Sequence, residues 1–146
     1  MNILKVLTPR RSLGNLGENY AARLLKKKGY RILERNYIGK WGEIDIIAGK
    51  RNLLAFVEVK TRSIQSQNAL ESRPAAAVNR EKQRKLIQIA DEYARKIHKK
   101  DGVLMRMDII EIYTEKNQNE KPKVKKAVHM ENAFDMNSAY KNTKGY

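Results

Sequence analysis

Two apolar runs, at 44–48 and 53–59, stand near the middle of the chain and are separated by the polar stretch Gly49-Lys50-Arg51-Asn52. Strand-forming residues that alternate around a Gly/Asn turn are a strong signal for a β-hairpin. We take Lys50-Arg51 as a two-residue turn, which pairs Gly49 with Asn52. The pattern therefore predicts two antiparallel strands at the centre of the fold.

The predicted register gathers the charged residues of this hairpin on one side. It places Glu43 opposite Glu58 and Asp45 opposite Phe56, and alternate residues of a strand share a face. The polar side carries Glu43, Asp45, Glu58 and Lys60, and the apolar side carries Ile44, Ile46, Ala55, Val57 and Val59. Carboxylates this close repel one another unless a cation or a proton lies between them. The hairpin therefore predicts a cluster of carboxylates that needs a partner.

The rest of the chain reads as helices and strands around this hairpin. We predict a helix over 12–28 ended by Gly29, a strand over 30–38, an irregular loop over 62–73, a helix from Pro74 to about Lys99, and strands over 103–113 and 124–130. This order predicts a single α/β domain with a mixed central sheet of about five strands and flanking helices. We expect its core over about 12–134 and flexible tails at 1–11 and 135–146.

Each predicted helix carries one charged residue near its apolar stripe. The first stripe contains Leu13, Leu16, Tyr20 and Leu24 and is widened by Ala21 and Leu25. Glu18 lies at its margin, where it either reaches inward or stabilises the helix N-terminus. The second stripe contains Leu86, Ala90, Tyr93 and Ile97, and four-residue steps backward lead to Lys82 and Val78. Lys82 either points its ammonium toward the sheet or extends it to solvent.

The charge balance narrows the class of partner. The chain holds 31 Lys and Arg against 16 Asp and Glu, a formal net charge of +15. Such an excess favours a polyanionic partner, most often nucleic acid. The chain has no cysteine, which excludes disulfides and thiolate metal sites and fits a cytoplasmic location. It has no apolar run of membrane-spanning length, so we expect a soluble protein.

The residue types of the hairpin suit metal-assisted chemistry. Asp45 and Glu58 offer the hard oxygen ligands that Mg²⁺ or Mn²⁺ prefers. A metal between carboxylates, with Lys60 near its water, is suited to phosphodiester hydrolysis. His98 and His129 show no metal-ligand spacing and are interpreted as ordinary structural or surface residues. Arg106 and Asp108 share a strand face and are expected to form an ion pair.

The chain also resembles a known family. It is similar to the YraN-like family, and through it to the PD-(D/E)XK nucleases, which include Holliday junction resolvases and other restriction-endonuclease-like enzymes. Val78 and Lys82 match the family's pattern, as do the segments GENYAARLLKKKGY (17–30), RN (35–36), GEIDII (42–47), FVEVKTR (56–62), MRMDIIEI (105–112) and ENAF (131–134). Ile44 stands where proline is usual and Met107 where phenylalanine is usual, and neither change removes a candidate ligand.

The resemblance implies a restriction-endonuclease-like core and a role for each site residue. Asp45 and Glu58 would ligate the metal, with Glu18 completing its shell. Lys60 would position the attacking water, and Lys82 would hold a phosphate. Glu43 is left open, because it would lie beside the metal shell, pair with a cation, or only cover the end of the hairpin. A homodimer is compatible with the resemblance.

These observations predict a metal-dependent nuclease-like protein that acts on DNA, including branched DNA. One alternative is a basic protein of the same fold that binds nucleic acid without cutting it. The intact set of Asp45, Glu58 and Lys60 favours the enzyme. A second alternative, an RNA-binding accessory protein, rests on charge alone, because the aromatic residues are scattered rather than clustered on strands.

Overall fold

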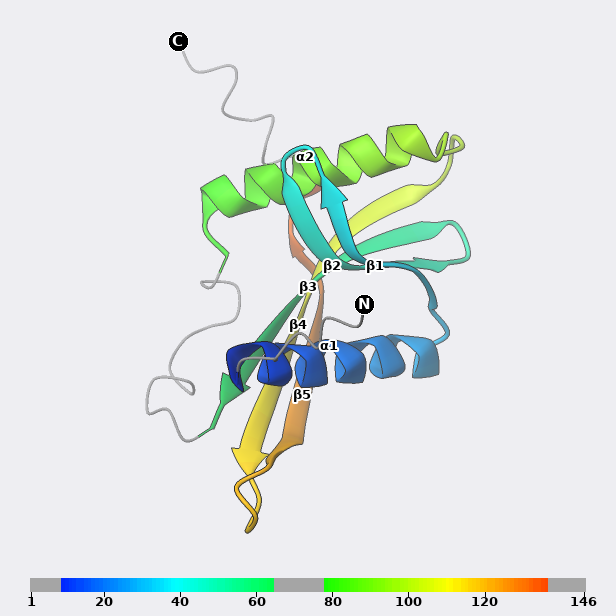
Figure 1. Cartoon of the computed structure of the whole chain (residues 1–146). Coiled ribbons are helices and arrows are strands. Elements are labelled where there is room, and N and C mark those ends of the chain that lie inside the picture. Colours follow the sequence, from blue (N-terminus) through cyan, green and yellow to red (C-terminus); the bar gives the residue numbers. More distant parts are fainter. Residues whose placement is uncertain (1–8, 65–77, 137–146) are drawn as a thin grey trace, which may run out of the picture.

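The computed structural model describes residues 9–64 and 78–136, which form one five-stranded sheet and two helices (Figure 1). The elements are α1 Pro9–Lys27, β1 Arg31–Gly39, β2 Gly42–Lys50, β3 Leu53–Ser63, α2 Arg80–Lys96, β4 Leu104–Lys116 and β5 Pro122–Phe134. The strands lie in the order β1-β2-β3-β4-β5, and only β3 and β4 pair in parallel. The predicted α/β class is confirmed, and the mixed sheet is consistent with a restriction-endonuclease-like core.

The helices cover opposite faces of the sheet, and Figure 1 shows the strands passing between them. Phe56 of β3 belongs to the apolar cluster beneath α2, whereas its neighbour Val57 belongs to the cluster beneath α1. A strand that is buried on both faces reads as a continuous apolar run, as β3 does. Within the described part of the chain, no helix is both long and apolar enough to cross a membrane.

The β2–β3 hairpin is present, but its predicted turn is wrong. Lys50 pairs with Leu53, so the two-residue turn is Arg51-Asn52 rather than Lys50-Arg51. Arg51 has a φ of +54°. A positive φ is what the tight turns of hairpins need at their first central position, and alternating apolar residues do not reveal which residue will adopt it.

The corrected register moves each pair by two residues, which leaves the side-chain faces unchanged. Phe56 lies opposite Ile47, not opposite Asp45. Continuing the register one step beyond the last ladder pair brings Glu58 opposite Asp45 rather than Glu43. The corrected register therefore directs Glu58 toward Asp45, and Glu58 is the carboxylate that raises the pKa of Asp45 most.

One apolar residue of the predicted inner face lies on the other side of the sheet. The sequence predicts Ile44 beside Ile46, but Ile44 packs with Ile47 beneath α2, whereas Ile46 packs beneath α1. The β2–β3 ladder ends at Ile46. Beyond that point the Val59 N–H donates to the Asp45 carboxylate at 2.8 Å, so the strict alternation of a paired strand no longer applies.

Helix α2 begins later than the pattern predicts. Pro74 lies outside the described residues, and the helix begins at Arg80 after the N-cap Asn79. The Asn79 side-chain oxygen accepts a hydrogen bond from Lys82 N at 2.9 Å, which satisfies an otherwise unpaired amide of the first turn. The helix ends at Lys96, earlier than predicted. A continuous helix from Pro74 is therefore wrong.

The buried face of α1 is centred on the two residues that widen the predicted stripe rather than on the middle of that stripe. Ala21 and Leu25 are fully buried, whereas Tyr20 and Leu24 are only partly so. Small side chains let the helix approach β3 closely. Glu18 consequently lies on the buried face, with 8% of its surface exposed, rather than at the margin.

Strands β4 and β5 are longer than the sequence predicts, and the connection between them shortens to 117–121. Backbone and side-chain contacts of Asn117 close this turn, with its Oδ1 accepting from Asn119 N and Lys121 N. The tails that the sequence predicts fall mostly outside the described residues, at 1–8 and 137–146.

We predict that Gly17→Ala destabilises the protein by about 1–3 kcal/mol, because the added methyl would overlap Thr61 Oγ1 and press on its Cβ and Cγ2. Gly14→Ala in the same helix is the matched control, since its methyl would meet nothing within 4 Å. It should be neutral or stabilise by up to about 1 kcal/mol through helix propensity. Urea unfolding of the three proteins measures both, and equal stabilities would contradict the close packing of α1 on β3.

Candidate active site

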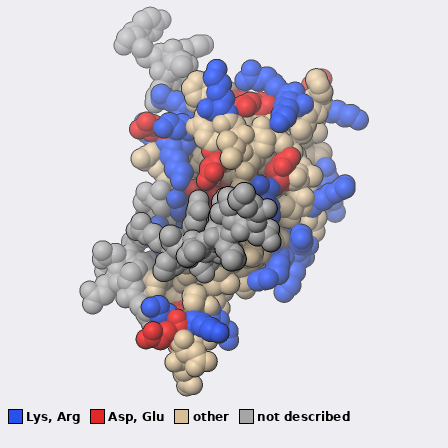
Figure 2. Space-filling model, viewed as in Figure 1, with Lys and Arg blue, Asp and Glu red and all other residues tan. Residues whose placement is uncertain are grey.

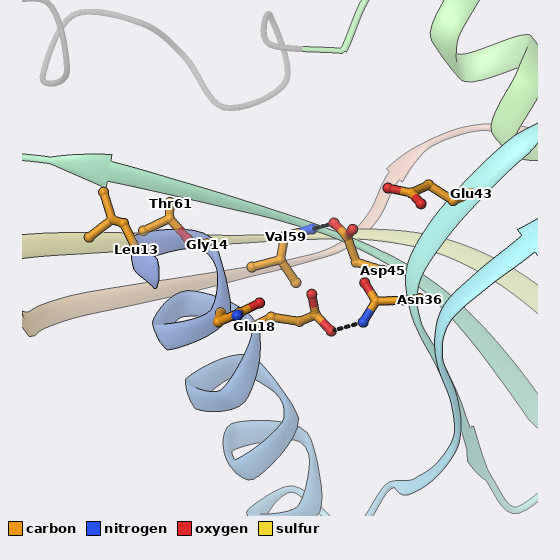
Figure 3. A pocket seen from close by; sticks show the side chains of 9 residues that line it. Leu13, Gly14, Glu18, Asn36, Glu43, Asp45, Val59 and Thr61 are labelled. Atoms are coloured by element: carbon orange, nitrogen blue, oxygen red, sulfur yellow. Dashed lines mark hydrogen bonds between the residues drawn. The ribbon is translucent and has the colours of Figure 1, made fainter. Parts of the chain in front are cut away.

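The candidate site lies where the β2–β3 ladder ends, between the first half of α1 and the first turn of α2. Two cavities adjoin there, and Asp45 and Glu43 line both of them. One, of about 490 Å³, also contains Glu18 and Thr61 (Figure 3). The other, of about 210 Å³, also contains Glu58 and Lys82. The structure therefore brings the predicted carboxylates together, with Asp45 between the two helices.

Asp45 is held by the backbone of the neighbouring strand. Its Oδ2 accepts a hydrogen bond from Val59 N at 2.8 Å. Burial, and then repulsion from Glu58, raise the pKa of Asp45 from 3.8 to about 7 against the lowering effect of that hydrogen bond. Glu18 and Glu43 raise the pKa of Asp45 further. Asp45 thus lies in an excess of negative potential that a cation would relieve.

Glu58 is balanced by two lysines. Its Oε1 lies 2.7 Å from Lys82 Nζ and 3.4 Å from Lys60 Nζ, and Glu58 is only 8% exposed. Lys82 therefore points its ammonium toward the sheet, and the alternative of a fully solvated head does not apply. This contact explains why a lysine continues the apolar stripe of α2.

The two lysines have opposite pKa shifts. Burial, together with the neighbouring Lys82, lowers the pKa of Lys60 despite the attraction of Glu58. Burial also acts to lower the pKa of Lys82, but the hydrogen bond and charge of Glu58 outweigh it, so the pKa of Lys82 is raised. Lys60 is therefore the more easily deprotonated of the pair.

Glu18 is fixed by two residues of β1 that the sequence analysis assigned no role. Its Oε1 accepts from Arg35 Nη2 at 3.0 Å, from Arg35 Nε at 3.2 Å and from Asn36 Nδ2 at 2.9 Å. Asn36 has a φ of +51°, a conformation that asparagine tolerates better than most residues. Figure 3 shows the Glu18 carboxylate extending from α1 toward Asp45. An asparagine within a predicted strand is the sequence signal that could have indicated a role for Arg35 and Asn36.

Glu43 lies at the rim of the site. It is exposed, lines both cavities and contributes to the raised pKa of Asp45. Of the roles that the sequence left open, the structure places it near the carboxylates and not merely at the end of the hairpin.

The oxygen donors of these residues are of the kind that a hard divalent cation prefers, but two of them, Glu18 and Glu58, form ion pairs with cations of the protein itself. All four acidic residues offer oxygen, and neither sulfur nor imidazole lines the two cavities. Across residues 9–64 and 78–136, no three His, Cys, Asp or Glu side chains are arranged to hold a metal ion. Both lysines lie at Oε1 of Glu58, and the excess negative potential at Asp45 favours a cation beside these carboxylates.

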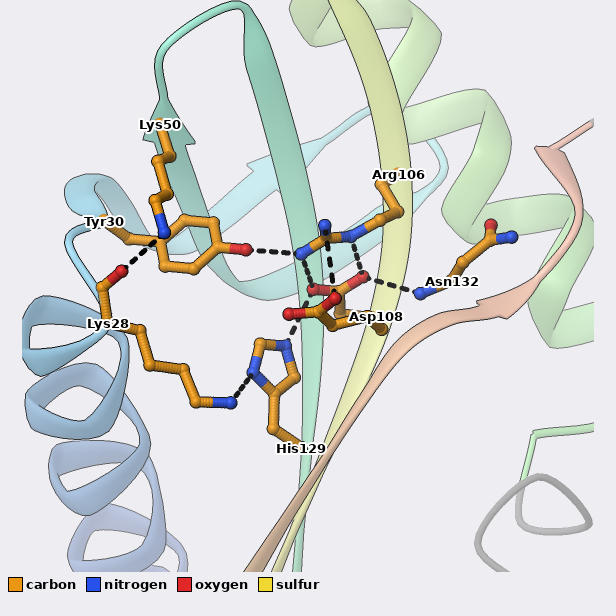
Figure 4. A network of polar contacts seen from close by, with 8 residues as sticks. Lys28, Tyr30, Lys50, Arg106, Asp108, His129 and Asn132 are labelled. Atoms are coloured by element: carbon orange, nitrogen blue, oxygen red, sulfur yellow. Dashed lines mark hydrogen bonds and ion pairs between the residues drawn. The ribbon is translucent and has the colours of Figure 1, made fainter.

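A second polar network lies away from these cavities and is structural (Figure 4). The predicted ion pair is confirmed, since Arg106 Nε and Nη2 each lie 2.7 Å from an Asp108 carboxylate oxygen. Asp108 also contacts His129 Nε2 at 2.8 Å and accepts from Asn132 N at 3.0 Å. Burial opposes ionisation of Asp108, but hydrogen bonds from His129 and Arg106 outweigh it and lower its pKa. The network ties β5 to β4.

His129 is a part of this network that sequence spacing did not reveal. Lys28 Nζ lies 2.8 Å from His129 Nδ1, and an ammonium can only donate. Nδ1 therefore accepts, and Nε2 carries the proton that faces Asp108. The interpretation of His129 as a structural residue is in agreement with these contacts, which join α1 to β5.

The acidic site stands within a basic surface. Figure 2 shows acidic side chains near the centre of one face, flanked by Lys and Arg side chains. On α2 the exposed basic residues are Arg80, Arg84, Lys85, Arg95 and Lys96. Such a distribution attracts a polyanion to the surface while keeping carboxylates at its centre.

We predict that Asp45→Asn stabilises the metal-free protein in a pH-dependent way. An acid whose pKa is raised by folding binds its proton more tightly in the folded state, so ionisation lowers the free energy of unfolding as the pH rises from about 4 to about 7. The free energy of unfolding of the variant should exceed that of wild type by an amount that grows across this pH window. The difference should reach about 2–4 kcal/mol at most and stay constant at higher pH.

Urea unfolding in chelator between about pH 4 and pH 8 measures this difference. Asp101→Asn, in an exposed turn, is the control and should show no such trend. A constant difference between Asp45→Asn and wild type would contradict the electrostatic account of the site.

Comparison with known proteins places this chain in a family. Residues 17–112 match the model of the uncharacterised protein family UPF0102. A UPF0102 protein of Alkaliphilus metalliredigens is 44% identical over 128 residues, which cover 85% of this chain and 98% of the relative. A UPF0102 protein of Caldanaerobacter subterraneus subsp. tengcongensis is 42% identical, covering 86% and 96% of the two chains. A UPF0102 protein of Desulfosudis oleivorans is 37% identical, covering 92% and 98%. The chain therefore belongs to the UPF0102 family.

Proposed function

We propose that this protein is a metal-dependent nuclease that hydrolyses phosphodiester bonds of DNA, with branched recombination or repair intermediates as its substrates. The observation that carries the proposal is the convergence of Asp45 and Glu58 from adjacent strands, with Lys60 beside them and Glu18 reaching in from α1. The likeness of the hairpin to the PD-(D/E)XK pattern supports the same assignment.

The carboxylates would hold Mg²⁺ or Mn²⁺. Asp45 and Glu58 are the principal ligands in this proposal, and Glu18 completes or steadies the shell from α1. A bound divalent cation would neutralise charge on the scissile phosphate and lower the pKa of the attacking water. The hydrogen bond from Val59 N holds the Asp45 carboxylate in place for this role.

Lys60 and Lys82 have different roles in this proposal. Lys60 has the lowered pKa, so more of it is present as the neutral amine that can take a proton from water, which it would also orient. Lys82 has the raised pKa and stays charged, so it would bind a non-bridging phosphate oxygen once Glu58 turns toward the cation. Glu43, at the rim, would bind water or pair with a cation when the substrate enters.

The charge of the protein supports nucleic acid as substrate. A net charge of +15 favours association with a polyanion, and basic side chains flank the acidic site. A cysteine-free chain suits a reducing cytoplasm, where such substrates occur. A homodimer would present two such sites to a branched substrate.

A second candidate function is DNA binding without cleavage. The observation in its favour is that Lys82 and Lys60 already neutralise Glu58, at 2.7 and 3.4 Å, so the site has internal cations in place of a metal. In that case the basic surface would bind DNA and the carboxylates would only stabilise the fold.

We predict that the purified protein cleaves a four-way junction or nicks plasmid DNA with Mg²⁺ or Mn²⁺. Asp45→Asn and Glu58→Gln should abolish cleavage and keep DNA binding, and Lys60→Met should slow cleavage by about 10²–10⁴-fold. Lys116→Met, at an exposed position on β4, is the control and should cleave as wild type does. The rates are measured on linear, nicked and branched DNA of one sequence.

A thermal-shift titration separates metal binding from activity. Mg²⁺ or Mn²⁺ should raise the melting temperature of wild type and not that of Asp45→Asn. DNA binding without cleavage on any of the substrates, and without a metal-dependent shift, would reject the nuclease and favour the binding protein.

A further inference from the structure

A basic groove of about 560 Å³ lies at the end of the sheet away from the candidate active site. It is formed where the β2–β3 turn meets the start of β1 and the residues that follow α2, and Figure 1 shows this turn and the end of α2 at the same end of the fold. Its basic lining consists of Arg31, Lys50, Arg51, His98, Lys99 and Lys100. We call it the distal groove.

The distal groove has a uniform charge. No acidic side chain of the described residues lines it, and Asp101, next in sequence to its wall, belongs to an exposed turn. This contrasts with the candidate active site, whose cavities contain four carboxylates. A concave surface whose charged side chains are all lysines and arginines concentrates the local positive potential and favours an anionic ligand.

Lys50 and Lys99 form hydrogen bonds within the walls of the groove, whereas other cations are exposed to solvent. Lys50 Nζ donates to Lys28 O at 2.7 Å, and Lys99 Nζ donates to Val103 O at 3.0 Å, so each ties one element of the groove to another. Arg31, Arg51 and Lys100 are exposed. The groove therefore combines a fixed frame with cations that can reach a ligand.

The floor of the distal groove is apolar. Leu33 and Ile97 line it and remain 38% and 43% exposed, although the sequence predicts Ile97 in the buried stripe of α2. A ligand with regularly spaced anions and an apolar body between them matches this lining. The sugar-phosphate backbone of nucleic acid has this composition, with phosphates for the rim and sugars for the floor.

The spacing between the two sites sets the size of ligand that can reach both. Lys82 lies in the first turn of α2 and His98 directly after its end, which separates them by roughly 24 Å at 1.5 Å per residue. That length corresponds to about seven base pairs of duplex DNA. Arg84, Lys85 and Arg95 lie exposed on the helix between them.

We infer that the distal groove is a second DNA-binding site, which holds the backbone of the same duplex about seven base pairs from the strand at the candidate active site. This inference rests on the proposed nucleic-acid substrate and adds to it the position and the minimum length of the duplex. Short duplexes then contact one site, and longer duplexes contact both and gain affinity.

The test measures binding of labelled hairpin duplexes of about 5 and about 20 base pairs by fluorescence anisotropy over a range of salt concentrations. The variant Arg31→Gln/Arg51→Gln/Lys100→Gln should bind the long duplex about tenfold more weakly and reduce the magnitude of the salt slope by about 1 for each cation removed. Its affinity for the short duplex should stay within about twofold of wild type.

Two matched variants control for charge and for folding. Lys116→Gln/Lys121→Gln/Lys123→Gln removes the same charge at the β4–β5 turn and should leave the preference for the long duplex intact. Arg31→Lys/Arg51→Lys/Lys100→Arg keeps the charge and should bind as wild type does. If the triple glutamine variant fails to fold by circular dichroism, Arg51→Glu, in an exposed turn, tests the same groove.

The outcomes separate this inference from the proposed function. Equal losses in the two triple glutamine variants, or no loss in the groove variant, would overturn the inference while leaving the nuclease proposal intact. Absence of DNA binding by wild type would overturn both. Cleavage of the short duplex at the wild-type rate by the groove variant would show that the candidate active site works without it.

Discussion

The bond between Val59 N–H and the Asp45 carboxylate is the contact on which the site depends. It lies where the β2–β3 ladder ends, after the pair of Ile46 and Val57. A side-chain oxygen there takes the place of a strand carbonyl, so the backbone amide is satisfied while the two strands diverge. The space that opens contains the carboxylates, and both helices contribute to its walls.

The carboxylates in this space differ in whether a lysine or arginine lies beside them. Asp45 bears the repulsion of Glu58, Glu18 and Glu43, and its pKa rises to about 7. Glu58 instead has Lys82 and Lys60, and Glu18 has Arg35. Among the described residues, Glu18 and Glu58 thus have ion pairs with cations of the protein, whereas no ion pair is formed by Asp45 or Glu43, which leaves an excess of negative charge at Asp45.

The fold keeps two kinds of polar cluster apart. The network of Arg106, Asp108 and His129 is closed, since its carboxylate is satisfied from three sides and its pKa is lowered. The cluster around Asp45 is open to cavities and its pKa is raised. Buried polar groups that stabilise a fold normally have all their hydrogen bonds, as Asp108 does. Groups with perturbed pKa values in a cleft are typical of functional sites, so the cluster around Asp45 is the functional candidate.

Much of this arrangement follows from local pattern. The α/β class, the central hairpin and the Arg106–Asp108 pair could be predicted because periodicity of two and of 3.6 residues fixes which side chains share a face. The same periodicity put Lys82 on the inner side of α2 but left the direction of its ammonium open. Placing the hairpin turn one residue too early shifts the predicted pairing by two residues, and this leaves most side chains on the predicted face because faces repeat every two residues. The start of α2 could not be predicted in this way, because a proline and an asparagine both mark helix beginnings.

The sequence by itself determined which residues form the centre of the candidate site: Asp45, Glu58 and Lys60 on adjacent strands, within a chain of high positive charge. Only the tertiary structure decided their partners. Arg35 and Asn36 reach Glu18, and His129 reaches Asp108, across long stretches of chain that no local period connects. The tertiary structure also decided on which side of the sheet Ile44 packs, because this depends on where the β2–β3 ladder ends. It likewise decided which cations meet in the distal groove, because these come from elements that lie together only at one end of the sheet.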